Sequence, residues 1–198
     1  MIFKLFFLFS AFLSLTHVFG QEKIWTKQTR ISEVMAFEKD INPSVKFLSH
    51  NVSLSKDDYP LADKYHVTNP IIVQREPSEY LPFYAEYFYT PNDSILRLAS
   101  YSWEKDRYGN FLEKQEIWKE EARKFETYNK EYERIKSILL TQLGIPTITD
   151  KKAKEVSSDQ GKYFTRETLW ETEDVYANLD MIFESTTYRI GLRIYWRK

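Results

Sequence analysis

The residues best suited to acid–base or metal chemistry are two histidines. His50 and His66 flank Asp57 and Asp58, and the chain has no cysteine. Two imidazoles and a carboxylate can bind a transition metal, and nearby serines would permit Ser-His-Asp catalysis. The histidines are too far apart for a helical i, i+4 pair, however, and no serine is flanked by the glycines of a nucleophile elbow. Two surface histidines are the simpler interpretation. A small secreted hydrolase or metal-dependent enzyme using His50 or His66 with a nearby Asp is the alternative function.

Other recognisable chemistry is sparse. The 29 acidic residues make adjacent carboxylates unavoidable, and only five glycines are present. No phosphate-binding loop, dinucleotide fingerprint or EF-hand occurs, so we expect no cofactor. Two N-glycosylation sequons begin at Asn51 and Asn92. Asp93-Ser94-Ile95 also fits a bacterial O-glycosylation pattern of Asp, Ser or Thr, and an aliphatic residue.

A second group of polar and aromatic residues falls near the C-terminus. Tyrosines supply contact area at low entropic cost, and arginines supply directional donors for carboxylates or hydroxyls. Together they predict a surface for a glycan or peptide ligand, or for an envelope protein. The competing interpretation is a solvated sheet face with cross-strand ion pairs. The candidate binding residues are Tyr176, Asn178, Arg189, Arg193 and Tyr195, with Glu167 and Asp180 between the two arginines.

The elements that would position this group are two alternating runs, 175–183 and 188–196. Apolar residues occupy every second position in both runs, which is typical of strands with one buried face. The link 184–187 is short and polar, as in a hairpin. The predicted register puts Leu179 opposite Leu192 and places both apolar sets on one face, whereas a one-residue slip would expose one set. On the other face, the predicted partners are Tyr176 with Tyr195, Asn178 with Arg193, and Ile182 with Arg189.

A third strand, 163–172, should precede this hairpin and turn at Glu173-Asp174. Neither of its registers is free of conflict. One register buries Phe164, Thr168 and Trp170 but points Arg166 inward, and the other buries Leu169 with Glu167. We prefer the first because it buries the aromatic residues.

Residues 111–143 have the pattern of one long amphipathic helix. Trp118, Phe125, Tyr132 and Leu139 recur at heptad spacing among charged residues, which gives one apolar stripe. Asn110 and Glu113 suit a capping box, and Gly144 suits the helix end. The length is compatible with a break near 120–123. A coiled-coil dimer is the alternative, but Asn129 and Lys136 stand where a zipper requires apolar residues.

An aromatic hairpin, 83–89 and 94–103, is predicted before this helix. The expected fold is therefore α+β, an antiparallel sheet of a hairpin and a C-terminal three-stranded meander packed against one long amphipathic helix. Residues 81–198 form this domain. Residues 21–80 are an irregular N-terminal segment with a possible helix at 29–40 and possible strands at 45–54 and 66–75.

Residues 1–20 have the layout of a signal peptide: Lys4, an apolar run, and small residues before Gln21. Cleavage would leave no stable membrane insertion, and the protein would be periplasmic or extracellular. The absence of cysteine favours a bacterial setting for an exported chain. The 28 basic and 29 acidic residues nearly balance, so nucleic acid is not an expected partner. The sequence therefore favours an exported, non-enzymatic binding protein acting through a sheet surface.

Overall fold

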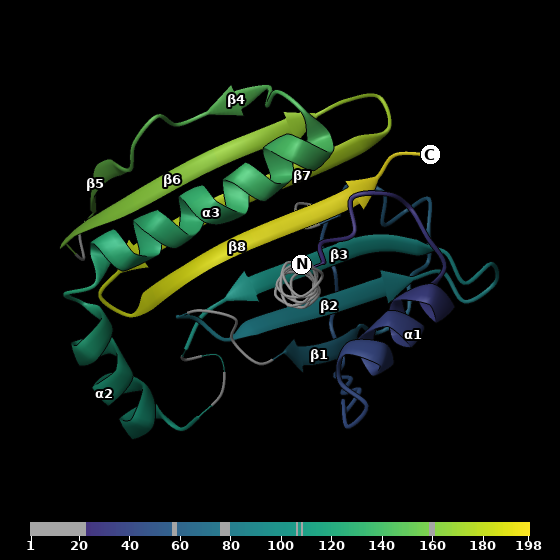
Figure 1. Cartoon of the computed structure of the whole chain (residues 1–198), viewed down its shortest axis with the longest axis horizontal. Coiled ribbons are helices and arrows are strands. Elements are labelled where there is room, and N and C mark those ends of the chain that lie inside the picture. The colour runs from purple at the N-terminus through teal and green to yellow at the C-terminus, as the bar shows by residue number, and fades with distance from the viewer. Residues whose placement is uncertain (1–22, 57–58, 76–79, 106, 108, 159–160) are drawn as a thin grey trace, which may run out of the picture.

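The computed structural model describes residues 23–56, 59–75, 80–105, 107, 109–158 and 161–198. The predicted signal peptide lies outside these residues. Within them, the chain combines helices with one antiparallel sheet, as an α+β fold does. The strand order is β1-β2-β3-β8-β7-β6-β4, with β5 also paired to β6 (Figure 1). The helices are α1 (Ile31–Ile41), α2 (Phe111–Glu121) and α3 (Phe125–Leu143). The strands are β1 (Ile71–Arg75), β2 (Phe83–Tyr89), β3 (Leu96–Trp103), β4 (Ile148–Thr149), β5 (Lys154–Ser158), β6 (Gly161–Glu171), β7 (Val175–Glu184) and β8 (Thr187–Trp196).

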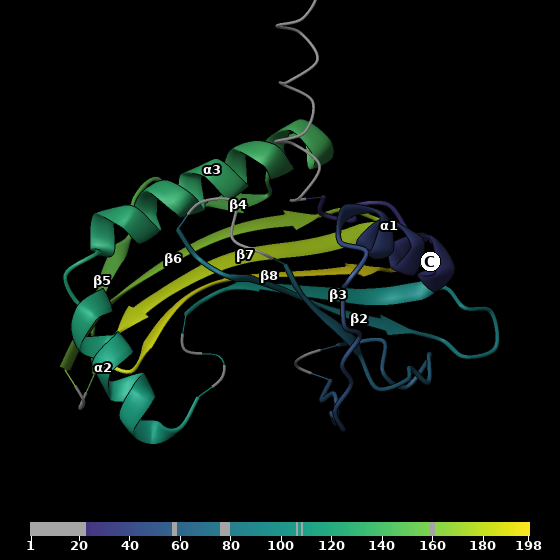
Figure 2. The ribbon, with the colours of Figure 1, turned by 60° about the horizontal axis from the view of Figure 1, so that its bottom comes forward.

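The main hydrophobic core lies between one face of the sheet and helices α1 and α3. Figure 2 shows both helices on this inner face, while the segment that follows α1 runs along the opposite, outer face. The α3 stripe buries Tyr128, Tyr132, Ile135 and Leu139 completely. Tyr132 donates a 2.8 Å hydrogen bond to Thr168, so α3 is held to the sheet by polar contacts as well as by apolar burial.

The C-terminal hairpin has the predicted register. Leu179 pairs with Leu192, and Tyr176, Asn178 and Ile182 pair with Tyr195, Arg193 and Arg189. Every second residue of β7 is buried, from Val175 to Phe183. The period-two pattern was sufficient because only one register buries both apolar sets.

β6 has the register with Arg166 inward. Thr168 pairs with Leu179, and Arg166, Thr168 and Trp170 are buried. Arg166 is tolerated there because α3 supplies its partners: the guanidinium bonds Asn129 at 2.7 Å and forms an ion pair with Glu133. Asn129 is one of the two residues whose polarity argues against a coiled coil. In the structure its side-chain oxygen accepts a hydrogen bond from the buried Arg166 guanidinium.

The prediction of a single long helix over residues 111–143 is wrong. The chain forms α2 and α3, separated by a short turn, and α2 bends away from the line of α3 (Figures 1 and 2). The turn places Glu121 in the interior at 0% exposure. Its carboxylate accepts hydrogen bonds from Tyr80 and Tyr128 and from the ammonium groups of Lys105 and Lys124. Glu121 stands seven residues before Tyr128, so in the helical pattern it falls on the same side as the buried α3 stripe. The predicted capping box at Asn110 is confirmed.

β3 joins the hairpin and the meander into one continuous sheet. It pairs antiparallel with β2 on one side and with β8 on the other. β8 is therefore an interior strand with β3 and β7 as neighbours, and its backbone is not available for strand addition by a partner.

The N-terminal segment contributes one helix and one strand. The helix expected at 29–40 is α1, and only the end of the run 66–75 forms a strand, β1. The run 45–54 has a single bridge, from Leu48 to Ile72, in place of the predicted strand. Ile24 and Val34 belong to the main core, so these residues are packed as part of the same structure.

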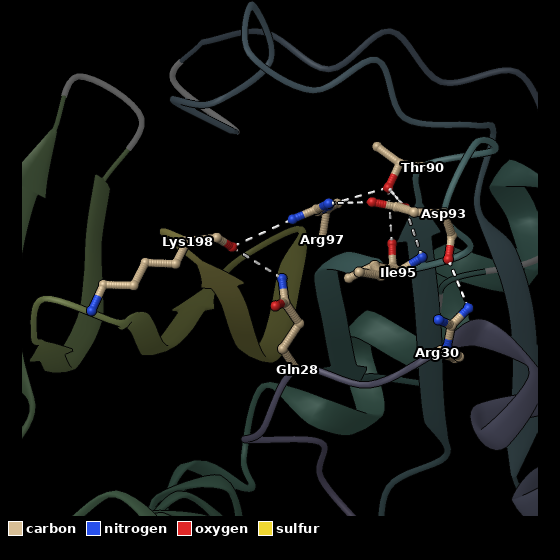
Figure 3. A network of polar contacts seen from close by, with 7 residues as sticks. All are labelled: Gln28, Arg30, Thr90, Asp93, Ile95, Arg97 and Lys198. Carbon is tan, nitrogen blue, oxygen red and sulfur yellow. Dashed lines mark hydrogen bonds and ion pairs between the residues drawn. The ribbon is translucent and has the colours of Figure 1, made fainter.

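A polar network joins three distant parts of the chain (Figure 3). Arg97 in β3 bonds Asp93 at 2.6 Å and the carbonyl oxygen of Lys198 at 3.4 Å. Gln28 donates to the same Lys198 oxygen, and Arg30 donates to the carbonyl oxygen of Asp93. These contacts link the start of the described chain and the β2–β3 turn to Lys198, two residues after β8.

Candidate functional site

Four of the five predicted binding residues lie on the outer face in rows that cross four strands, and the fifth, Arg189, lies beyond these rows, opposite Ile182. The pairings of β2, β3, β8 and β7 define the rows. The first row is apolar and aromatic, and the next two are polar. The rows are Phe88, Leu98, Tyr195 and Tyr176; then Glu86, Ser100, Arg193 and Asn178; then Tyr84, Ser102, Gly191 and Asp180.

The aromatic row is covered by the segment that precedes β1. Tyr176 and Tyr195 stack with ring centroids 4.6 Å apart, and Tyr59 meets Tyr195 edge-on. Tyr195 is only 6% exposed, and Tyr59 is fully buried. Tyr59 and Tyr195 therefore belong to a small second core with Phe88 and Leu98, against which Tyr176 packs, and Tyr195 offers little surface to a ligand.

The polar rows surround an open hollow of about 260 Å³. It gathers residues from the hairpin and from the C-terminal meander, and it contains two of the five predicted binding residues, Arg189 and Arg193. Its lining residues are Glu86, Ser100, Tyr101, Ser102, Arg107, Asp180, Arg189, Gly191, Leu192 and Arg193.

Gly191 makes room for a carboxylate in this hollow. A Cβ at position 191 would lie 2.7 Å from Oδ1 of Asp180 on the neighbouring strand. Asp180 accepts no hydrogen bond from the described residues. Burial raises the pKa of the Asp180 carboxyl, while the positive charges of Arg189 and Arg193 act in the opposite direction. The hollow thus holds an acceptor with unused hydrogen-bonding capacity.

The arginines of the hollow differ in how fully they are engaged. Arg107 is committed to the protein, since it bonds Ser102 at 2.7 Å and forms ion pairs with Glu104 and Glu86. Arg189 donates no hydrogen bond to the described residues, and its buried Nε is among the side-chain atoms that lack a partner there. Arg189 and Asp180 are therefore the two charged groups of the hollow that protein contacts leave unsatisfied.

Asn178 is turned toward the edge of this group. Its amide donates a 2.8 Å hydrogen bond to Glu167 and a long one, 3.4 Å, to the Tyr176 hydroxyl. Asn178 is not among the residues that line the hollow. Its role in the structure is to link β7 to β6.

A second hollow, of about 170 Å³, adjoins the first. It lies over the first and second rows, under the segment that contains Val52 and Leu54. It shares Glu86, Ser100 and Arg193 with the larger hollow, and its remaining lining residues are Val52, Leu54, Phe88 and Leu98.

The residues that sequence reasoning missed come from the first hairpin and the loop after it. Glu86, Ser100, Ser102 and Arg107 reach the site because β3 pairs with β8, a contact between segments far apart in the chain. One local signal was present. Gly191 interrupts a run of large strand residues, and a glycine inside a strand often marks a close approach by another group.

The histidines show no comparable arrangement. His50 and His66 are both exposed, and no group of three or more His, Cys, Asp or Glu among the described residues could hold a metal ion. Asp57 and Asp58, the proposed carboxylate partners, lie outside the described residues. The sequon residues Asn51 and Asn92 are exposed, and Asn51 accepts a hydrogen bond from Asn69.

Comparison with known proteins identifies no relative that would assign a function to this site. In the described part of the chain, no helix is long and apolar enough to cross a membrane. No protein-family model matches the chain, and neither the curated proteins nor the solved structures provide a match.

Proposed function

We propose that this is an exported, non-enzymatic binding protein that receives an anionic polar group of its ligand in the outer-face hollow. The observation that carries the proposal is the pair formed by Arg189 and Asp180. Both face a hollow open to solvent, and neither has a hydrogen-bond partner among the described residues. Unsatisfied polar groups in a native structure call for an explanation, and a ligand that completes their hydrogen bonds is a direct one.

The charges of the lining favour an anion. Three arginines and two acidic residues surround the hollow. Burial raises the pKa of the Asp180 carboxyl, which lowers its tendency to carry a negative charge. A carboxylate suits Arg189 because the planar guanidinium binds it through two parallel hydrogen bonds. A hydrogen-bond donor on the same ligand would satisfy the carboxylate of Asp180.

The test is a titration of ¹⁵N-labelled protein with small compounds of three kinds: carboxylates, neutral sugars and ammonium compounds. We expect carboxylates to shift the Gly191 amide and the Nε–H signals of Arg189 and Arg193. Arg189→Gln should weaken that binding by about tenfold to a hundredfold, the loss expected when a charge-assisted hydrogen bond worth about 1.5–3 kcal/mol is removed.

The matched control is Arg123→Gln, which removes an exposed arginine at the turn between α2 and α3. It should leave the titration unchanged. Equal binding of all three kinds of compound, equal losses for both variants, or no shift at Gly191 with any compound would each contradict the proposal.

A further inference from the structure

The two hollows of the outer face form one groove. Glu86, Ser100 and Arg193 line both of them. These residues make up most of the second row, which lies between the polar third row and the apolar first row. A ligand anchored in the larger hollow can therefore continue into the smaller one without leaving the surface.

The groove changes from charged to apolar along its length. Arg189 and Asp180 stand at one end. Val52 and Leu54 face Phe88 and Leu98 at the other. The apolar end has a volume of about 170 Å³, which suits one or two aliphatic side chains better than a long acyl chain.

The distance between the first and third rows, over which the two hollows lie, sets the length of the ligand; Arg189 lies beyond the third row on β8, but it lines the same larger hollow. Gly191 lies in the third row and Tyr195 in the first, on the same strand. At about 3.4 Å per residue along a strand, the rows are separated by about 14 Å. An extended peptide advances about 3.3–3.6 Å per residue, so about four residues cover this span. A single sugar ring or amino acid does not.

We infer that the groove binds an extended peptide segment of about four residues, with a carboxylate at the Arg189 end and an apolar side chain at the Leu54 end. The inference rests on the proposed function and adds the ligand class. A peptide fits because its backbone N–H groups can donate to Asp180 and its carbonyl groups can accept from the Ser100 hydroxyl. Its carboxylate complements the net positive lining, and its apolar residue fills the second hollow.

The experiment uses a parent peptide and three probes, each of which lacks a stated part of it. The parent is acetyl-Leu-Ala-Ala-Ala with a free carboxylate. The second probe is its C-terminal amide, the third replaces Leu with Ala, and the fourth is acetyl-alanine, which keeps only the carboxylate end. Binding of each to ¹⁵N-labelled protein is followed at the Gly191 and Leu54 amides.

We expect the parent to bind at least fivefold more tightly than each of the other three probes and to shift both amides. Leu54→Ala should weaken the parent by about threefold to tenfold but leave the third probe unaffected, since that probe has no leucine to lose its contact. The control is Leu48→Ala, on the same segment but half exposed and outside both hollows. Leu48→Ala should change the affinity for neither the parent peptide nor the third probe.

The outcomes separate the two proposals. If the amide binds as tightly as the parent, the anionic site itself is refuted. If the carboxylate and Arg189 matter but acetyl-alanine binds as well as the tetrapeptide, the hollow binds a small acid and the peptide inference is overturned. It is equally overturned if Leu54→Ala has no effect, or if no probe shifts either amide.

Discussion

Position 191 illustrates how one missing side chain shapes the site. Gly191 lies between Ser102 and Asp180 in neighbouring strands, and the space that a Cβ would fill is taken by the Asp180 carboxylate. The glycine has an ordinary strand conformation, since its φ is not among the positive values. Its presence is explained by the neighbouring carboxylate, and backbone strain plays no part.

Gly191→Ala should therefore act in opposite directions in two backgrounds. In the wild type it should lower the free energy of unfolding by about 1 kcal/mol or more, because the added methyl displaces Asp180. In an Asp180→Ala background it should raise stability by about 0.5–1 kcal/mol, as the loss of glycine flexibility predicts. Urea denaturation of the four proteins measures the coupling. Equal effects in both backgrounds would show that the two residues do not interact.

The raised pKa of Asp180 predicts a pH-dependent stability. A carboxyl whose pKa is higher in the folded than in the unfolded state stabilises the fold fully below its unfolded pKa, about 3.9, and that contribution is lost as pH rises through the folded pKa. The charged groups that act on it are Glu167, Arg189 and Arg193. Asp180→Asn should thus gain stability relative to the wild type between pH 3 and pH 7. Denaturant titrations across this range would contradict the assignment if the difference stayed constant.

At the scale of elements, the turn between α2 and α3 depends on one buried carboxylate. Glu121 receives hydrogen bonds from two tyrosines and two lysines. Burial alone would raise its pKa, but the hydrogen bonds of Tyr80, Lys124, Lys105 and Tyr128 lower it overall. The carboxylate is therefore held in its charged form, and the helix direction changes where it enters the interior.

Glu121→Ala should destabilise the protein by about 3 kcal/mol or more, because it leaves the surrounding cationic and hydroxyl groups without their acceptor. Glu120→Ala, at the neighbouring exposed position, should cost within about 0.5 kcal/mol even though it removes an ion pair with Lys124. Thermal and urea denaturation of both variants check the contrast. Similar losses would mean that helix propensity, and not the buried carboxylate, holds the turn.

Glu121 should also make stability sensitive to acid. A carboxyl with a lowered folded pKa contributes stability above its unfolded pKa, about 4.3, and loses it as pH falls through the folded value. The wild type should therefore lose more stability than Glu121→Gln between pH 6 and pH 3. A parallel decline of both proteins would contradict this role.

At the scale of the whole molecule, the two faces of the sheet differ in what covers them. The inner face is covered by α1 and α3 around the main core, and among the described residues the outer face is covered mainly over its aromatic row. The polar rows remain open as the groove. This division would give the proposed ligand a rigid floor, because the strands beneath the groove are packed on the main core on their other side.

The proposed location of the protein has a direct test. The layout of residues 1–20 predicts cleavage before Gln21 during export. Mass spectrometry of the protein recovered from the envelope or medium should find Gln21 as the first residue. Recovery of the intact Met1–Gly20 sequence on the exported protein would contradict the prediction.

The sequence alone determined the parts of the fold that depend on local periodicity. The β7–β8 register, the β2–β3 hairpin and the Asn110 cap follow from alternation, turn residues and capping chemistry that act over a few residues. The orientation of Arg166 was harder to predict from the sequence, because a buried arginine is stable only when another element supplies its hydrogen-bonding and ion-pair partners. The apolar stripe is present in α3, and the length of 111–143 allowed a break near 120–123, but the burial of Glu121 required knowing where Tyr80 and Lys105 would lie.

Only the tertiary structure decided the site. The candidate residues on β7 and β8 were placed on one face by register, yet their surroundings depend on β3 pairing with β8 and on residues 52–54 and 59–67 packing on the outer face. The first contact brings Ser100 and Arg107 to Arg189, and the second buries Tyr195. Both are contacts between segments distant in sequence, with no periodic signal of their own. The strand pattern therefore identified the face, while long-range packing determined which part of it remains open to a ligand.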